Sequence, residues 1–198
     1  KLGHDVTIYE AKSQIGGQFN IAKEIPGKEE FHETIRYFEK QIELNNISLK
    51  LDTKVTLDIL KNTDFDDFVF STGIEPRIPK IDGIDSQNVL TYSDVLLDKK
   101  NVGKSVAIIG AGGIGFDTAE FLAHNQAHKP TSLDKEAFYK EWGINIEHNT
   151  PGAVMEKISE KSFREIYLLQ RKKTKLGKSL GKTTGWIHRQ SLVDKGIN

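Results

Sequence analysis

The sequence predicts an α/β fold built on a mainly parallel sheet. Short apolar or alternating segments typical of strands are interspersed with segments of helical periodicity along the 198 residues. Strands that alternate with helices imply crossover connections, which join parallel strands. In addition, one buried strand, residues 106–109, runs directly into a glycine-rich turn and then a helix.

The first half of the chain contains three expected strands and one expected helix. Residues 5–10 form a strand, and a glycine-rich loop at Gly16-Gly17 follows it. Apolar residues at helical spacing predict a helix over 31–44. Alternating apolar and polar residues predict a half-buried strand over 47–51. A short apolar strand at 68–70 leads into Ser71-Thr72-Gly73.

The second half follows the polar, turn-like residues 98–103 and shares the α/β character of the first half. We expect strands at 106–109 and 166–169, helices at 116–123 and 186–193, and a short helix at 134–142. Residues 125–163 otherwise lack clear periodicity, and we treat them as an insertion. The domain boundary is placed after residue 98, which gives domains of residues 1–98 and 99–198.

Composition excludes several classes of function. Twenty-eight basic and 28 acidic side chains give no net charge, which argues against nucleic acid or an anionic membrane as partner. The absence of cysteine excludes disulfides, thiol chemistry and iron–sulfur ligation by this chain alone. No apolar run reaches the roughly 18 residues of a membrane span. We expect a soluble, cytoplasmic protein.

The strongest motif is the G-x-G-x-x-G that follows the strand at 106–109. Gly110 permits the tight turn, Gly112 lets the backbone approach a pyrophosphate, and Gly115 allows close packing of helix on strand. The following helix offers free N–H groups and a positive dipole end to phosphates. The motif predicts a Rossmann-like dinucleotide site; a glycine-rich turn without a ligand is the alternative.

The residues after the strand at 166–169 indicate which dinucleotide is bound. An NAD site places an acid at the end of the second strand, about 20 residues after the motif. Here the strand ends in Gln170-Arg171-Lys172-Lys173. Cations at that position would pair with a 2′-phosphate, so the sequence favours NADP(H). A solvated basic stretch remains the alternative.

The first half carries a second nucleotide signature. The strand at 5–10 ends in Glu10, and the Gly16-Gly17 loop follows. This is typical of the second strand of an FAD-binding unit, with the acid on the adenosine ribose and the glycine pair near the diphosphate. The strand at 68–70 followed by Thr72-Gly73 is similar to a segment of two-nucleotide flavoproteins. An exposed acid at the end of a strand is the alternative for Glu10.

Other motifs in the sequence do not predict a functional site. Gly177 lies one residue too close to Gly181 for a phosphate-binding P-loop, and no strand precedes it. His124 and His128 have helical spacing but lack a third ligand, so we expect no metal site. No catalytic triad or carboxylate pair is identifiable.

With both signatures in view, the chain resembles the bacterial NADPH-dependent 2,4-dienoyl-CoA reductases, iron–sulfur flavoproteins of the old yellow enzyme and trimethylamine dehydrogenase group. The resemblance covers nearly all of the chain except residues 125–163. It is carried by the runs IGGQFNIAK at 15–23, IPGKEEF at 25–31, VAIIG through IGFDTA at 106–119, and LGKTTGWIHR at 180–189.

The resemblance implies a particular organisation. In this family a barrel domain with FMN precedes cysteines that hold a [4Fe–4S] cluster, and an FAD domain with an inserted NADPH domain follows. This chain resembles the last part, a fragment of a two-nucleotide-binding flavoprotein with a three-layer fold. It would lack the first FAD-binding strand and its glycine motif, and end within the NADPH domain. FMN and the cluster would belong only to the parent protein, whose barrel and iron–sulfur region would be partners of this chain.

The resemblance also implies site residues, none of them catalytic. Glu10 would bind the FAD ribose, and the backbone of Val55 would face the adenine. The FAD-side candidates are completed by Gln18, Lys28 and Gly73. The NADPH pyrophosphate would lie against Gly110, Gly112, Gly113, Ile114 and Gly115, and its 2′-phosphate against Arg171 and Lys172. The run Gly181–Arg189 would either face the nucleotide or form a structural loop.

Three functional hypotheses follow. The first is the part of a dienoyl-CoA reductase that receives electrons from NADPH, acting in β-oxidation of unsaturated fatty acids. The second is a related two-nucleotide flavoprotein, such as a disulfide or sulfur reductase. The third is a nucleotide-binding module without activity, which would hold NADPH but bind FAD weakly or not at all.

Overall fold

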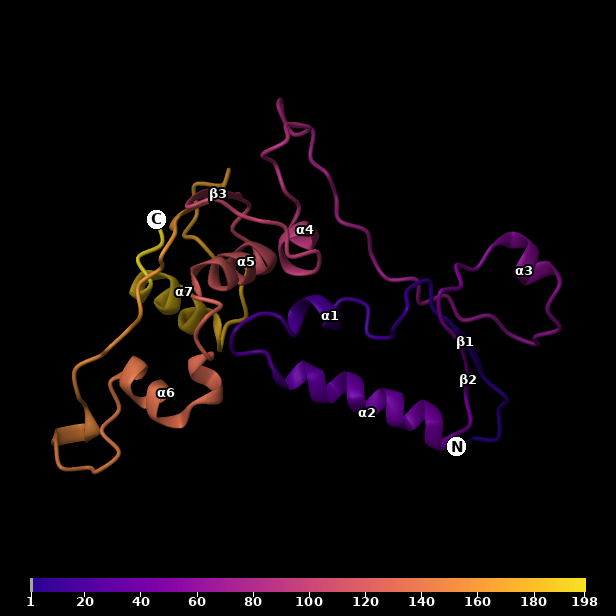
Figure 1. The fold of residues 1–198 in the computed structure, drawn as a ribbon, viewed down its shortest axis with the longest axis horizontal. Coiled ribbons are helices and arrows are strands. Elements are labelled where there is room, and N and C mark those ends of the chain that lie inside the picture. Colours follow the sequence, from indigo (N-terminus) through magenta and orange to yellow (C-terminus); the bar gives the residue numbers. More distant parts are fainter. Residues whose placement is uncertain (1) are drawn as a thin grey trace. The chain divides into compact units, whose positions relative to one another are not determined.

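The computed structural model describes residues 2–198, which form two compact units (Figure 1). The first contains the residues up to Lys23 together with Glu30–Asp85, and the second contains Glu24–Glu29 and Ser86–Asn198. Each unit holds a two-stranded parallel sheet, which agrees with the predicted α/β class. The division into FAD and NADPH domains after residue 98 concerns nucleotide binding and stays a prediction.

The first unit is a crossover between two short strands. Its elements are β1 (Thr7–Tyr9), α1 (Phe19–Ala22), α2 (Glu30–Leu44), β2 (Ser48–Lys50) and α3 (Leu57–Lys61). Thr7 pairs with Ser48 and Tyr9 with Lys50, in parallel. The helix and the two strands confirm the predictions for 31–44, 5–10 and 47–51, although both strands are shorter than expected.

The predicted strand at 68–70 is wrong. Within the described residues the backbone of this segment has no strand partner, and Phe68, Val69 and Phe70 are 44, 89 and 71% exposed. A strand requires a neighbour for its N–H and C=O groups, and the sheet of the first unit consists of β1 and β2. An apolar run by itself indicates where a strand could form, and the pairing decides whether it does.

The second unit contains the glycine motif. Its regular elements outside the insertion are α4 (Tyr92–Leu96), β3 (Ser105–Ile109), α5 (Gly113–Ala123), β4 (Glu165–Leu169) and α7 (Gly185–Asp194). β3 and β4 pair in parallel over five residues, from Ser105 with Glu165 to Ile109 with Leu169. These elements confirm the predicted strands and helices of the second half, with α5 beginning directly in the glycine motif.

The core of the second unit lies between this sheet and α5. Ile166 and Leu168 of β4 are buried, and Phe116 of α5 is 2% exposed. α5 packs on β3, β4 and α7, and α5 and α7 lie side by side in Figure 1. The opposite face of the sheet is open, with Ile109 67% and Leu169 48% exposed.

The insertion at 125–163 has local structure of its own. It contains the 3-10 helix η1 (Thr131–Leu133), α6 (Lys135–Trp142) and the 3-10 helix η2 (Pro151–Ala153). Asp134 caps α6, because its side chain accepts hydrogen bonds from the N–H groups of Glu136 and Ala137. Gly143 ends the helix in the left-handed conformation. This confirms the short helix predicted at 134–142.

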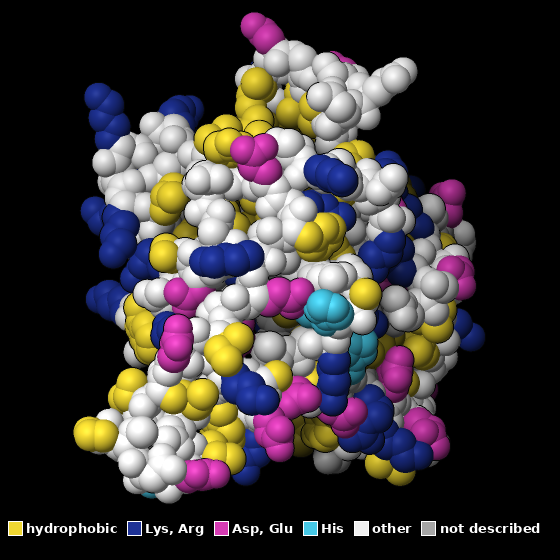
Figure 2. Space-filling view, turned by 60° about the vertical axis from the view of Figure 1, so that its left-hand side comes forward, with side chains coloured by type: hydrophobic (Ala, Val, Ile, Leu, Met, Phe, Trp, Pro, Cys, Tyr) yellow, Lys and Arg dark blue, Asp and Glu magenta, His cyan; other side chains and the backbone are white. Residues whose placement is uncertain are grey.

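The surface mixes charged and apolar side chains. Figure 2 shows Lys, Arg, Asp and Glu interspersed over the face in view, with hydrophobic side chains exposed between them. Among residues 2–198, none of the helices has the length and apolarity needed to cross a membrane.

Candidate nucleotide-binding site

The glycine motif forms the turn between β3 and α5. Gly110 has φ of +124°, a conformation that favours glycine, and its N–H donates to the carbonyl of Leu169 at 2.8 Å. A Cβ at Gly115 would lie 1.7 Å from the Gly110 oxygen. Gly115 therefore permits the close approach of helix to strand that the sequence predicts for this position.

The other face of the motif is open. Ideal Cβ atoms at Gly112 and Gly113 would meet nothing within 4 Å, and Ile114 beside them is 51% exposed. Gly112 is the N-cap of α5 and has no side chain to bond the first-turn N–H groups. Free N–H groups and unobstructed backbone at a helix N-terminus fit a pyrophosphate.

The parallel register places the end of β4 beside this turn. Because Ile109 pairs with Leu169, Gly110 and Gln170 follow their strands at the same edge of the sheet. Arg171 and Lys172, which come next, are exposed, and neither forms an ion pair with a carboxylate in the described part of the chain. Gln170 Nε2 donates to the Lys172 carbonyl at 2.8 Å and also to that of Thr174, which holds this turn.

The sequence alone could not establish this proximity. The strand that pairs with β3 lies beyond the insertion at 125–163, so the usual spacing between motif and second strand fails. The structure resolves the question, because β4 is the parallel neighbour of β3. It thus brings Arg171 and Lys172 to the edge that carries the motif.

In the first unit, the structure brings Glu10 and the segment that precedes Val55 together. Glu10 follows β1, its N–H donates to the Lys50 carbonyl, and its own carbonyl accepts from Thr53 N–H, both at 2.9 Å. Val55 lies two residues beyond Thr53 and is half-buried. Glu10 Oε1 accepts from Lys12 N–H at 2.9 Å, which fixes the turn after β1.

Gly16, the first glycine of the pair, has a structural task that the sequence did not reveal. Gly16 has φ of +114°, and a Cβ there would lie 2.9 Å from Asn20 Nδ2 and 3.0 Å from Ile35. Gly16 therefore lets the loop pack against α2, whatever it does for a diphosphate. Gln18, at the N-terminus of α1, is exposed.

The structure describes the surroundings of two further FAD-side candidates, Gly73 and Lys28. Gly73 has φ of +75° in an exposed stretch, with open space around its Cβ position. Lys28 belongs to the second unit, where its Nζ lies 2.6 Å from Asp117 Oδ1 on α5. Their roles toward FAD stay predictions.

Sequence reasoning missed several polar residues of this region. Asp117 and Glu120 lie on α5, three residues apart and directly after the motif, and they contact Lys28 and His188 respectively. A second omission is Asn20 of α1, which is 7% exposed and whose Oδ1 has no hydrogen-bond partner among residues 2–198. The runs QFNIA and IGFDTA contain Asn20 and Asp117, but the sequence does not show which atoms of these residues meet other side chains.

The histidines considered as metal ligands have other partners. His124 Nε2 lies 3.0 Å from the His128 carbonyl, and His128 Nδ1 lies 2.9 Å from Glu160 Oε1. Throughout residues 2–198, no three His, Cys, Asp or Glu side chains gather in a way that could hold a metal ion.

Comparisons with known proteins agree with this geometry. A family model described as pyridine nucleotide-disulphide oxidoreductase matches residues 1–198. The chain is 34% identical over 135 residues to an NADH oxidase of Thermoanaerobacter brockii, which covers 64% of this chain and 20% of that protein. It is 33% identical over 125 residues to a cinnamate reductase of Clostridium sporogenes, covering 61% of this chain and 18% of that one.

A solved structure gives the same result for the fold. A 2-naphthoyl-CoA reductase in complex with 2-naphthoyl-CoA matches 99% of this chain and 24% of its own, with a TM-score of 0.74 and 28% identity. The Rossmann-like α/β fold with parallel sheets is thereby confirmed. The chain spans about a fifth of the length of the two curated relatives.

Proposed function

The chain belongs to the pyridine nucleotide-disulphide oxidoreductase family, and from this premise we propose that it binds NADPH and passes hydride to FAD within a larger reductase. FAD and NAD(P)H are the cofactors of the family. The observation that carries the proposal is the β3–α5 turn, open at Gly112 and Gly113, beside the cationic end of β4.

Each NADPH-side residue has a defined task in this proposal. The N–H groups at the start of α5 bind the pyrophosphate, and Gly112 and Gly113 leave space for it. Arg171 and Lys172 pair with the 2′-phosphate, which NADH lacks. Bound there, NADPH supplies a hydride; the chain's residues hold and orient it.

On the FAD side, Glu10 accepts hydrogen bonds from the adenosine ribose and the backbone of Val55 faces the adenine. Gln18, Lys28 and Gly73 lie along the rest of the flavin nucleotide. Asn20 joins this set because its buried Oδ1 lacks a partner, and buried polar atoms are rarely left unsatisfied. FAD supplies a two-electron acceptor when bound.

For the whole protein, we propose a cytoplasmic reductase that acts on 2,4-dienoyl-CoA in unsaturated fatty acid β-oxidation, with FMN and a [4Fe–4S] cluster elsewhere in it. Two relatives are named for conjugated, unsaturated acyl compounds: cinnamate and 2-naphthoyl-CoA. The alternative is a disulfide- or sulfur-reducing flavoprotein. The description of the matching family model, pyridine nucleotide-disulphide oxidoreductase, supports that alternative.

Substitution of Arg171 tests the NADPH assignment. Removal of one charge-assisted hydrogen bond to the 2′-phosphate weakens NADPH binding by about tenfold or more, and NADH binding hardly changes. We expect isothermal titration to show this loss for Arg171→Ala. The matched control is Lys61→Ala, which removes an exposed cation of α3 in the first unit. Equal affinity of the unaltered chain for NADPH and NADH would rule out the 2′-phosphate assignment.

A further inference from the structure

An ionisable pair of the second unit joins α5, whose N-terminus forms part of the proposed NADPH site, to α7. His188 Nδ1 on α7 lies 3.2 Å from Glu120 Oε1 on α5. The Glu120 side chain is only 9% exposed and that of His188 29%. A carboxylate so deeply buried requires a partner. The sequence assigned no role to Glu120 and placed His188 only within the run 181–189, whose atoms it left unassigned.

The same stretch of α7 also holds the loop between β4 and α7, residues 170–184. Arg189 Nη1 donates to the Gly177 carbonyl of this loop at 3.2 Å. Gly177 packs against Phe116 of α5, since a Cβ there would lie 2.8 Å from the ring. The loop is thus bounded by α5 on one side and by α7 on the other.

These contacts form a closed ring. Glu120 and Phe116 are one turn apart on α5, and His188 and Arg189 are neighbours on α7. The His188–Glu120 contact fixes α7 on α5, and the Arg189–Gly177 contact fixes the loop on α7. Arg171 and Lys172 lie at the start of that loop, where it leaves β4 beside the glycine motif.

We propose that His188 is a positioning residue for recognition of the 2′-phosphate: by holding α7 on α5, it fixes the loop that presents Arg171 and Lys172 to NADPH. This inference rests on the proposed NADPH site and adds a determinant of its specificity. His188 itself does not touch the nucleotide in this proposal. Its removal therefore lowers the preference for NADPH over NADH and leaves the pyrophosphate site intact.

Protonation of His188 strengthens the contact. The Glu120 carboxylate raises the pKa of His188 above its ordinary value of 6.5, and burial opposes this rise. Charged groups facing the ring are Glu120 and Asp117 of α5 and Lys28 of residues 24–29, with Arg189 adjacent on α7. Because the folded-state pKa is raised, the stabilisation is complete below about pH 6.5 and is lost as the pH rises through the folded-state value.

The experiment compares NADPH and NADH binding by the unaltered chain, His188→Gln and His128→Gln between pH 7 and 9. The 2′-phosphate has a second pKa of about 6, so its own charge is nearly constant over this range. His128→Gln is the matched control, because His128 forms an exposed pair with Glu160 away from the motif. For His188→Gln we expect the NADPH affinity to fall by about five- to tenfold. We also expect the preference of this variant for NADPH over NADH to be independent of pH. NADH affinity should change less than about twofold.

Trypsin gives a second readout that does not depend on nucleotide. The loop contains six cleavable residues: Arg171, Lys172, Lys173, Lys175, Lys178 and Lys182. We expect cleavage in this loop to accelerate in His188→Gln and to remain unchanged in His128→Gln. A His188→Gln chain with unaltered cleavage and unaltered NADPH preference overturns the inference.

The two proposals fail differently. If the unaltered chain does not prefer NADPH, the proposed 2′-phosphate site fails, and loop cleavage alone decides whether His188 positions the loop. If the preference exists and His188→Gln retains it, only the His188 inference fails. Should His188→Gln not fold, Glu120→Gln removes the charge of the same contact from the other helix, and loop cleavage that is no faster in this variant than in the unaltered chain contradicts the proposal.

Discussion

Gly113 and Gly115 lie two residues apart in one motif and meet different surroundings. A side chain at Gly113 would point into open space, whereas one at Gly115 would collide with the Gly110 carbonyl. The sequence predicted both glycines as site residues and gave Gly115 the task of close packing between helix and strand, which the structure confirms. The path of the backbone leaves open space at Gly113 and none at Gly115.

Alanine at each position distinguishes these tasks. Gly113→Ala should keep or raise the thermal midpoint, because alanine favours the helix by up to about 1 kcal/mol, and should weaken NADPH binding measured by titration. Gly115→Ala should lower the free energy of unfolding by more than about 2 kcal/mol, since the collision forces helix and strand apart. Unaltered NADPH affinity in Gly113→Ala would contradict a pyrophosphate at this turn.

Among the elements, those with a clear period and a partner were predictable. β3, α5 and β4 have compact apolar patterns, and their pairing buries Ile166 and Leu168. The segment 68–70 has a similar composition but no partner strand, so its prediction was wrong. The contact between His188 and Glu120 joins residues that are 68 positions apart in the sequence. No local sequence pattern specifies which polar side chains meet across such a separation.

The short helix α4 is stabilised by hydrogen bonds at its N-terminus. Thr91 and Asp94 form a capping box, and Lys100 pairs with the same Asp94 carboxylate. These hydrogen bonds hold the pKa of Asp94 well below its usual range. α4 places Val95 and Leu96 in the core, so the cap contributes to the packing of the second unit.

The stability contributed by Asp94 should depend on pH. Because its folded-state pKa is lowered, this stability is present above the unfolded-state value near 3.8 and is lost as the pH falls below it. We expect Asp94→Asn to lower the thermal midpoint at pH 7 and to differ progressively less from the unaltered chain toward pH 2. Asp82→Asn, at an exposed turn, is the control; a difference that persists unchanged to pH 2 would argue against the cap as its cause.

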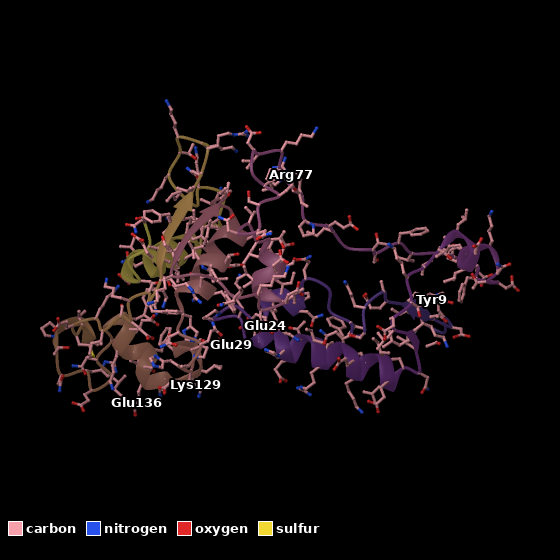
Figure 3. The ribbon with its side chains drawn as sticks, turned by 45° about the horizontal axis from the view of Figure 1, so that its top comes forward. Tyr9, Glu24, Glu29, Arg77, Lys129 and Glu136 are labelled. Carbon is pink, nitrogen blue, oxygen red and sulfur yellow. The ribbon has the colours of Figure 1, made fainter. Side chains whose placement is uncertain are left out.

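At the scale of the whole molecule, the sequence predicted two successive domains, but the chain of the first unit is interrupted. Residues 24–29 belong to the second unit, although both flanking segments belong to the first. Ile25 is 1% exposed, Glu24 pairs with Lys99 at 2.6 Å, and Glu29 accepts from Ser132 at 3.0 Å. Figure 3 labels Glu24 and Glu29, the two ends of this segment. A segment of six residues is too short to show a sequence periodicity of its own, so only tertiary contacts show that it belongs to the second unit.

The substrate is a property of the whole protein, because this chain spans about a fifth of the length of its curated relatives. We expect the full-length protein, supplied with NADPH, to reduce 2,4-dienoyl-CoA at least about tenfold faster than a disulfide. Consumption of NADPH, followed at its absorbance band, measures both rates. Faster reduction of the disulfide would favour the alternative flavoprotein assignment instead.

Because residues 24–29 belong to the second unit, they limit how chimeras of this protein can be built. To exchange the whole second unit with that of a relative, a chimera must take two separate gene segments, 24–29 and 86–198, from one donor. A single crossover after residue 85 would leave Lys28 of one parent facing residue 117 of the other. Recombination between such genes should therefore succeed most often where both parents have complementary charges at these two positions.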